Sequence, residues 1–199
     1  MKKYQPALAA PLLIGLYGAI RLLPGSKEPE AGWLLGHAAL LGGLLFFVPV
    51  LLELRRRAAS RLLGTVALVV AGTGLAASVG QTLIDLWVGM VAVDKADQHR
   101  LFAEIQDVPG VLPVFYTALP TLFYLGLLVL LCAAFRRIAL WSPLLVLVLV
   151  ATVLMAIDLD LMTPGALLFA LALRPLTAPM GPAGPVARPA AQRQVVSPR

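Results

Sequence analysis

The sequence predicts an all-α protein, a polytopic integral membrane bundle of six transmembrane helices with the N and C termini in the cytoplasm. The composition is 60% hydrophobic and 13% charged, whereas about a quarter of the residues in a typical soluble domain are charged. The positive charges gather in clusters at every second gap between apolar stretches, and lysine and arginine are retained on the cytoplasmic side of membrane proteins. These clusters are Lys2–Lys3, Arg55–Arg57 with Arg61, Arg136–Arg137, and Arg174 with the C-terminal tail.

The acidic residues between the apolar stretches fit the same topology. Glu53 lies among the arginines. The others fall in gaps assigned to the outside, and they are Glu28, Glu30, Asp94, Asp97, Glu104, Asp107, Asp158 and Asp160. We therefore expect a multi-pass protein of the cell membrane. The basic residues behind the net charge of +6 then face anionic lipid headgroups, so the expected partner is the lipid bilayer and not a nucleic acid. The sequence predicts no oligomeric state.

The lengths of the apolar segments place the helices, because a spanning helix needs about 20 residues. We expect spanning helices over residues 6–23, 33–54, 61–93, 111–135 and 138–157. Residues 94–110 form the one sizeable outer loop. Apolar residues recur at helical spacing within that loop, and they predict a short helix that lies on the outer surface.

The sixth helix is predicted to be shorter than the others. Thr163-Pro164-Gly165 is typical of an N-cap followed by proline at the first helical position, and too few residues remain before Arg174 for a full crossing. The helix therefore either begins earlier, near Leu159, or is a re-entrant half-helix buried against its neighbours. The chain divides into a six-helix membrane domain, residues 1–176, and a disordered cytoplasmic tail, residues 177–199, which is rich in proline and alanine.

The chain contains few residues that could bind a metal ion or form a disulfide. Cys132 is the single cysteine, which excludes an intrachain disulfide, and its apolar surroundings predict a buried packing thiol. His37 and His99 are the two histidines, and no paired-histidine motif lies on one helix, so we expect no metal and no cofactor. Asp158 and Asp160 offer two carboxylates to a cation or a diphosphate, but residues two apart on a helix point to different sides. A solvated helix end is the other interpretation.

Polar residues within the apolar helices are the candidate functional residues, because an ionisable side chain in a bilayer is costly unless it is paired or faces water. Gln81 and Asp85 continue a stripe of small and polar residues on one face of the third helix. His37 lies at a similar depth on the second helix, in the outer third of the membrane. We expect these three residues to form one outward-facing site with Tyr116 and Asp158. The loop with His99, Glu104 and Asp107 is a candidate lid. A histidine and an aspartate near an interface also pair, or are hydrated, for structural reasons alone.

Such a site favours a membrane-embedded enzyme that acts on an apolar isoprenoid or lipid substrate by acid–base chemistry. Asp85, Asp158 and His37 are the candidate catalytic residues, since a carboxyl group in low-dielectric surroundings keeps a proton near neutral pH. Aromatic faces stabilise a developing carbocation. The expected substrate-binding residues are Gln81, Trp87, Phe115, Tyr116 and Tyr124, with Phe123 beside them.

In chain size, helix number and intramembrane acids, the chain is similar to small membrane-bound terpene cyclases, and this likeness is one of general layout. Two other classes of function use the same residues or none of them. A proton- or ion-coupled carrier would use His37 and Asp85, although the chain shows no internal repeat of the kind many transporters have. A non-catalytic accessory or immunity protein would need no chemistry from these residues.

Overall fold

A computed structural model describes residues 6–134 and 143–177, and every secondary-structure element in that part of the chain is helical. The elements are α1 (Pro6–Arg21), α2 (Ala31–Arg57), α3 (Arg61–Val91), α4 (Lys95–Gln106), the π-helix η1 (Val111–Ala118), α5 (Leu119–Ala134), α6 (Pro143–Ile157), the short 3₁₀-helix η2 (Leu159–Leu161), α7 (Met162–Leu173) and η3 (Arg174–Thr177).

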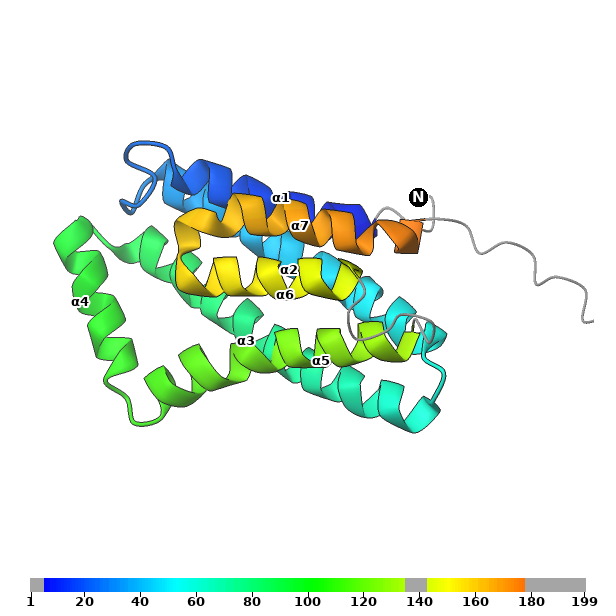
Figure 1. The fold of residues 1–199 in the computed structure, drawn as a ribbon. Coiled ribbons are helices and arrows are strands. Elements are labelled where there is room, and N and C mark those ends of the chain that lie inside the picture. Colours follow the sequence, from blue (N-terminus) through cyan, green and yellow to red (C-terminus); the bar gives the residue numbers. More distant parts are fainter. Residues whose placement is uncertain (1–5, 135–142, 178–199) are drawn as a thin grey trace, which may run out of the picture.

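The long helices lie alongside one another between two ends of the molecule (Figure 1). The α1–α2 loop, α4 and the α6–α7 turn lie at one end, and the α2–α3 turn lies at the other. Helix α2 is central, because it packs against α1, α3 and α5. Its Phe47 is 1% exposed and meets the rings of Phe123 on α5 and Phe169 on α7 at centroid distances of 5.0 and 6.1 Å. Phe47 therefore marks the centre of the core.

Three helices are long and apolar enough to cross a membrane: Ala31–Arg57, Arg61–Val91 and Val111–Ala134. Three further segments are apolar but shorter: Pro6–Arg21, Pro143–Ile157 and Leu159–Leu173. Large apolar side chains on these helices are exposed, as Leu12 on α1 and Leu149 on α6 illustrate, which is the surface that lipid requires. The all-helical fold is therefore confirmed, and the three long apolar helices support the class of membrane protein.

Helices α3 and α5 cross at a pair of glycines. A Cβ atom on Gly74 of α3 would lie 2.1 Å from the backbone nitrogen of Phe123 on α5. Reciprocally, a Cβ atom on Gly126 of α5 would lie 2.4 Å from the backbone nitrogen of Ala71 on α3. No side chain fits between the two backbones at either position, and such close approach is how small residues join helices in membranes.

The short helix predicted between residues 94 and 110 is present as α4. Asp94 is its N-cap, and the Asp94 carboxylate accepts the backbone N–H of Asp97 at 2.8 Å. The Asp97 carboxylate in turn accepts the backbone N–H of Val93 at 3.2 Å, so carboxylates satisfy two free donors at this helix start. Gly110, at φ +86°, turns the chain from α4 into η1.

Two predictions of local structure are wrong. Thr163 is not an N-cap, because α7 begins at Met162 and the Thr163 hydroxyl donates to the Gly15 carbonyl at 3.1 Å. Cys132 is exposed, not buried. The helix predicted over 111–135 is present from Val111 to Ala134, and its first eight residues are the π-helix η1. The predicted start of the fifth helix at Ile138 and the predicted disordered tail lie outside the described residues, except that η3 extends to Thr177.

The α3–α5 crossing predicts opposite effects for two glycines on the same helix. Gly74→Ala places a methyl group against the backbone of α5 and should lower the free energy of unfolding by about 1–3 kcal/mol. Gly72→Ala is the matched control, because its Cβ would meet nothing within 4 Å; it should be neutral or stabilising by up to about 1 kcal/mol. Thermal unfolding of the detergent-purified variants measures both changes. Equal stability of the two variants would contradict the close crossing.

Candidate functional site at the outer ends of α2 and α3

His37 of α2 and Asp85 of α3 form a pair near the end of the molecule that carries α4. The Nε2 atom of His37 lies 3.7 Å from Oδ2 of Asp85. The histidine side chain is 5% exposed and the aspartate side chain 22%. Both residues belong to helices that are long and apolar enough to cross a membrane. The structure therefore brings together, across the α2–α3 interface, the two ionisable residues that the sequence places at the same depth.

The orientation of the histidine ring fixes where its protons lie. Nδ1 of His37 lies 2.9 Å from the backbone carbonyl oxygen of Trp33, one turn earlier on α2. A carbonyl oxygen only accepts, so Nδ1 carries a hydrogen and donates it. In the neutral ring Nε2 is then an acceptor, and at 3.7 Å it lies beyond hydrogen-bond distance of the Asp85 carboxylate. The pair is a close contact of two ionisable groups, and a proton on Nε2 would make it an ion pair.

The indole of Trp33 joins the two helices above this pair. Its ring lies over the His37 ring, with centroids 4.1 Å apart and planes inclined by 31°. Its Nε1–H donates to the backbone carbonyl of Asp85 at 2.8 Å. Gly89 on α3 makes room for it, since a Cβ atom there would lie 2.3 Å from Cδ1 of the indole. Trp33 therefore positions both members of the pair.

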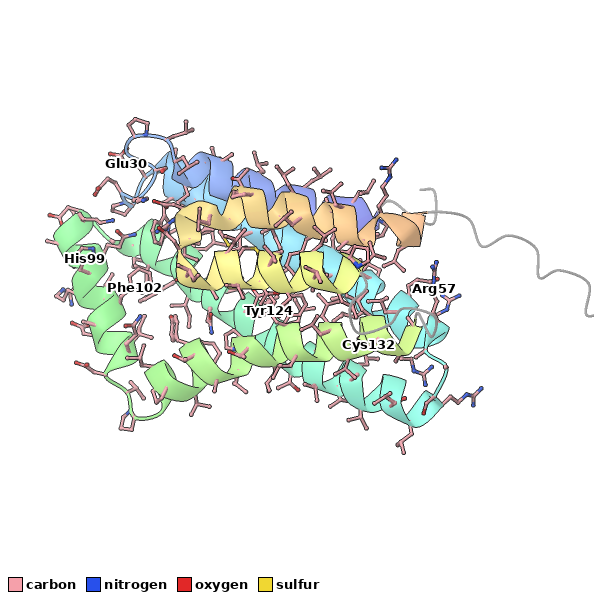
Figure 2. The ribbon with its side chains drawn as sticks, in the orientation of Figure 1. Glu30, Arg57, His99, Phe102, Tyr124 and Cys132 are labelled. Atoms are coloured by element: carbon pink, nitrogen blue, oxygen red, sulfur yellow. The ribbon has the colours of Figure 1, made fainter. Side chains whose placement is uncertain are left out.

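Helix α4 covers the outer side of Trp33. The Phe102 ring lies 6.1 Å from the Trp33 ring between centroids, and the Lys95 ammonium lies 5.9 Å from the centre of the indole. The same ammonium group donates to the Lys27 carbonyl in the α1–α2 loop. Figure 2 shows Phe102 on the side of α4 that faces the bundle. The outer loop thus packs over the pair through two residues on one face of α4.

Helix α1 completes the surroundings of His37. The Tyr17 ring meets the His37 ring edge to face at 5.2 Å, and Tyr17 also interacts with Arg21. These three residues line a small recess with Trp33. Arg21 donates from Nε to the Asp160 carboxylate at 2.9 Å, so it links α1 to the α6–α7 turn. Lys27 binds the other oxygen of that carboxylate at 2.9 Å.

Gln81 forms a hydrogen bond to the backbone of η1. Its Nε2 donates to the carbonyl oxygen of Phe115. In the π-helical register the Leu119 N–H donates to the Val114 carbonyl. The residue that would donate to the Phe115 carbonyl in the same register is Pro120, which has no N–H. Gln81 therefore satisfies a buried carbonyl that a proline leaves free, which gives it a structural role in joining α3 to η1.

Asp158 lies apart from the pair. It is exposed, and its carboxylate accepts the backbone N–H of Asp160 at 2.8 Å, as the N-cap of the 3₁₀ turn η2. Asp158 therefore lies at a solvated helix end. Asp160 instead binds two basic side chains of the protein itself, Arg21 and Lys27. The structure does not bring Asp158 to His37.

The aromatic residues predicted to shape a cavity do not converge on the recess beside His37. Trp87 is 47% exposed. Phe115 stacks edge to face on Tyr116 at 5.4 Å, Tyr124 packs on the apolar core next to Phe123, and Tyr116 lies within electrostatic range of the Asp85 carboxylate. Tyr116 is thus the one aromatic residue of this set that the structure relates to the pair.

The residues of the candidate lid point to solvent. His99 and Asp107 are exposed, and Glu104 pairs with Arg100 at 2.6 Å. Within residues 6–134 and 143–177, no three or more histidine, cysteine, aspartate or glutamate side chains are grouped to hold a metal ion. The part of α4 that contacts the site is its opposite face.

Sequence reasoning missed two neighbours of His37, Tyr17 and Trp33. Tyr17 sits among apolar residues of α1, and nothing in the sequence relates it to His37. The order of Trp33 and His37, four residues apart, is the signal that indicates stacking, because such residues lie above one another on a helix.

Comparison of the chain with protein-family models, with curated proteins and with solved structures finds no match. A function for this chain is therefore inferred from the arrangement of its own residues.

The acidic turn between α6 and α7 predicts a pH-dependent contribution to stability. Hydrogen bonds from Lys27 and Arg21 hold the pKa of Asp160 below its usual value of 3.8. A carboxyl group whose folded-state pKa is lowered stabilises the fold above the unfolded pKa and loses that effect as pH falls through the folded pKa. Asp160→Asn should therefore lower the unfolding temperature at neutral pH, and the difference from the parent should disappear as pH falls below 3.8.

Asp158→Asn is the matched control, because asparagine keeps the oxygen that accepts the Asp160 N–H. It should unfold like the parent at every pH. A pH-dependent loss in Asp158→Asn and none in Asp160→Asn would contradict the assignment of the ion pairs.

Proposed function

We propose that this chain is a six-span protein of the cell membrane with both termini in the cytoplasm. The three short apolar helices support this, because α1 packs against the long helix α2, α6 packs against α5, and α7 packs against α1 and α6. The sixteen residues of α1 cover about 24 Å at 1.5 Å per residue. A span a few ångströms short of the hydrocarbon core is accommodated by local thinning and by flanking side chains. In the last segment, η2, α7 and η3 follow one another without a break from Leu159 to Thr177, which favours a crossing over a half-helix.

The distribution of charge supports the orientation. Arg55, Arg56 and Arg57 form the last turn of α2, and Arg61 begins α3 at the same end of the bundle. Figure 2 shows Arg57 at the end opposite Glu30 and His99. The cytoplasm then lies at the arginine-rich end, and the His37–Asp85 pair lies in the outer part of the membrane.

Within that topology, the function that the geometry supports best is acid–base catalysis on an apolar substrate, an isoprenoid or another lipid. The observation that carries this proposal is the contact of His37 with Asp85, 3.7 Å between Nε2 and Oδ2, on two helices that are long and apolar enough to cross a membrane. A histidine and a carboxylate within reach of each other are a common acid–base unit, and burial removes competing water. The bilayer itself would deliver the substrate. A proton would pass between the pair and the bound lipid, with Trp33 and Tyr17 holding the imidazole in place.

The position of the buried polar residues favours an enzyme over a carrier. Four buried polar residues are found in the described part of the chain: Ser26, His37, Thr82 and Gln98. All of them lie in the outer half of the proposed topology. Towards the arginine-rich end, the core consists of apolar side chains such as Leu51, Leu54 and Leu130. A carrier needs a polar path to both sides, and these residues supply one only towards the outside.

Labelling from outside the cell tests the topology. In a Cys132→Ser background, Glu30→Cys and His99→Cys should react with an impermeant maleimide, and Arg56→Cys and Arg193→Cys should react only after the membrane is opened. Glu30, His99 and Arg56 are exposed on the protein, so failure to react reflects the membrane and not burial. Labelling of Arg193→Cys in intact cells would show that the C-terminal tail lies outside, which contradicts a sixth crossing.

Replacement of Asp85 tests the catalytic role. Asp85→Asn keeps the size of the side chain and removes the titratable proton, so it should accumulate normally and lose activity by about 100-fold or more, the usual contribution of an acid–base group. Mass spectrometry of lipid extracts from cells that make either protein at equal abundance supplies the measurement. A lipid species that depends on the parent should be missing with Asp85→Asn. Asp107→Asn, at an exposed turn, is the control and should match the parent.

Identical lipid spectra for cells with the parent, with Asp85→Asn and with no copy of the protein would end the enzyme proposal. A non-catalytic accessory role would then take its place. Loss of protein abundance in Asp85→Asn, with unchanged product per molecule, would make the pair a structural contact.

A further inference from the structure

An apolar groove of about 290 Å³ lies between α2 and α3 on the surface of the bundle. Leu51 and Leu75 are its buried lining residues, whereas Val48, Leu52 and Ala76 are exposed along it. The other residues of the lining are Leu68, Gly72 and Val79. Every lining residue is apolar, so the groove suits a hydrocarbon chain, and a polar ligand would lose its hydrogen bonds there.

The absence of a side chain at Gly72 keeps this groove free. A Cβ atom on Gly72 would meet nothing within 4 Å, so the groove runs across the bare backbone of α3 at that position. Leu68 and Val79 are the two ends of the lining on α3, and they are about 16 Å apart at 1.5 Å per residue. One leaflet contributes about half of a hydrocarbon core of roughly 30 Å. The groove therefore has the length of one leaflet.

The two helix faces that line the groove continue to polar residues at the arginine-rich end. Arg55 follows Leu52 by three residues, and Thr65 precedes Leu68 by three, so each continues the lining face of its helix. Nη2 of Arg55 donates to Oγ1 of Thr65 at 3.2 Å. The stem of Arg55 also lies against α3, since a Cβ atom on Gly64 would be 3.7 Å from its Cγ. The guanidinium group is therefore held where the groove ends, about one helical turn from its lining.

Arg55 has no carboxylate partner within the described part of the chain. Glu53, the acid nearest to it in the sequence, instead binds Arg56 at 3.6 Å and Arg57 at 2.8 Å. Arg61, exposed in the first turn of α3, likewise has no carboxylate partner among the described residues. Two positive charges thus lie at one end of an apolar groove. A molecule with an anionic head and a hydrocarbon chain is complementary to both parts.

The same charges decide between a lipid and a second copy of the chain. Gly72 and Ala76 are small residues four apart, a spacing that also joins helices in membranes. All copies in one membrane have the same orientation, so a second copy packed on this face would bring its own Arg55 and Arg61 to the same level. Like charges repel, whereas the phosphate of a lipid would be attracted. The charges therefore favour the lipid.

We propose that the α2–α3 groove binds an anionic phospholipid of the cytoplasmic leaflet, with one acyl chain across Gly72 and the headgroup phosphate on Arg55. The phosphate would accept from the guanidinium N–H groups that the hydrogen bond to α3 leaves free, and Arg61 would add positive charge. The proposed topology assigns this end of the bundle to the cytoplasm. The site does not depend on the His37–Asp85 pair, so each can fail without the other.

Native mass spectrometry of the detergent-purified protein tests the headgroup. Dioleoyl phosphatidylglycerol should bind as one molecule per chain, with a Kd about tenfold or more below that of dioleoyl phosphatidylcholine, which has the same acyl chains and no net charge. Arg55→Gln should raise the Kd for phosphatidylglycerol about tenfold. Arg56→Gln removes the same charge from an exposed residue that pairs with Glu53, and it should bind like the parent. Equal losses in the two variants would overturn the proposal, because binding would then follow the net charge and not the site.

Substitutions in the groove test the place of the acyl chain. Gly72→Leu puts a side chain into the groove and should also raise the Kd for phosphatidylglycerol about tenfold. Thr73→Leu, at the next and exposed position of α3, lies outside the lining and is the matched control; it should bind like the parent. Ala76→Leu fills the groove from its exposed side and should repeat the loss, so the test stands even where Gly72→Leu does not accumulate. Binding equal to that of the parent in a folded Gly72→Leu or Ala76→Leu protein would overturn the proposal.

Glycerol phosphate and the mass of the complex identify other occupants. Glycerol phosphate carries the headgroup phosphate without acyl chains, so an excess of it should not displace phosphatidylglycerol. Displacement would overturn the lipid site in favour of a site for a soluble phosphate. A dimer that Gly72→Leu dissociates would overturn it in favour of a second copy of the chain.

Discussion

The bond from the Trp33 indole to the backbone of Asp85 is the interaction on which the candidate site depends. It runs from α2 to α3, and it requires Gly89, because any side chain there would occupy the space of the indole. The same ring covers His37 on one side and supports α4 on the other. One side chain therefore fixes the distance between His37 and Asp85 and the position of the outer helix.

The sequence predicted the fold class and the pairing of His37 with Asp85, because both depend on patterns along the chain. Apolar length and clustered arginines indicate helices in a bilayer, and counting residues from helix ends places side chains at a depth. The contacts of Gln81 and Asp158 were not predictable in this way. Gln81 binds the Phe115 carbonyl only because η1 adopts a π-helical register, and the sequence gives no sign of that register beyond two prolines. Asp158 turned out to cap a 3₁₀ turn, a feature that periodicity does not detect.

The helices pack against one another in different ways in the two halves of the bundle. In the middle of the bundle, α3 and α5 approach at Gly74 and Gly126 until their backbones touch, and the core around Phe47 and on towards the arginine-rich end is apolar. Close packing supplies the stability there, since lipid gives no hydrophobic drive between helices. Near α4, the helices are joined through side chains that bridge them, such as Trp33 to the Asp85 carbonyl and Gln81 to the Phe115 carbonyl. Polar groups can be accommodated only in this second half.

This division has a consequence for function. A tightly packed, apolar half towards the arginine-rich end leaves the half that carries α4 free to keep groups that do not contribute to stability. Gln98 and the Tyr116 hydroxyl are such groups, and they lie on the elements that complete the outer half, α4 and η1. A protein that needed only to fold would gain by replacing them with apolar residues. Polar groups without partners call for an explanation in a native protein, and a bound ligand would supply one at the end of the bundle that carries α4 and η1.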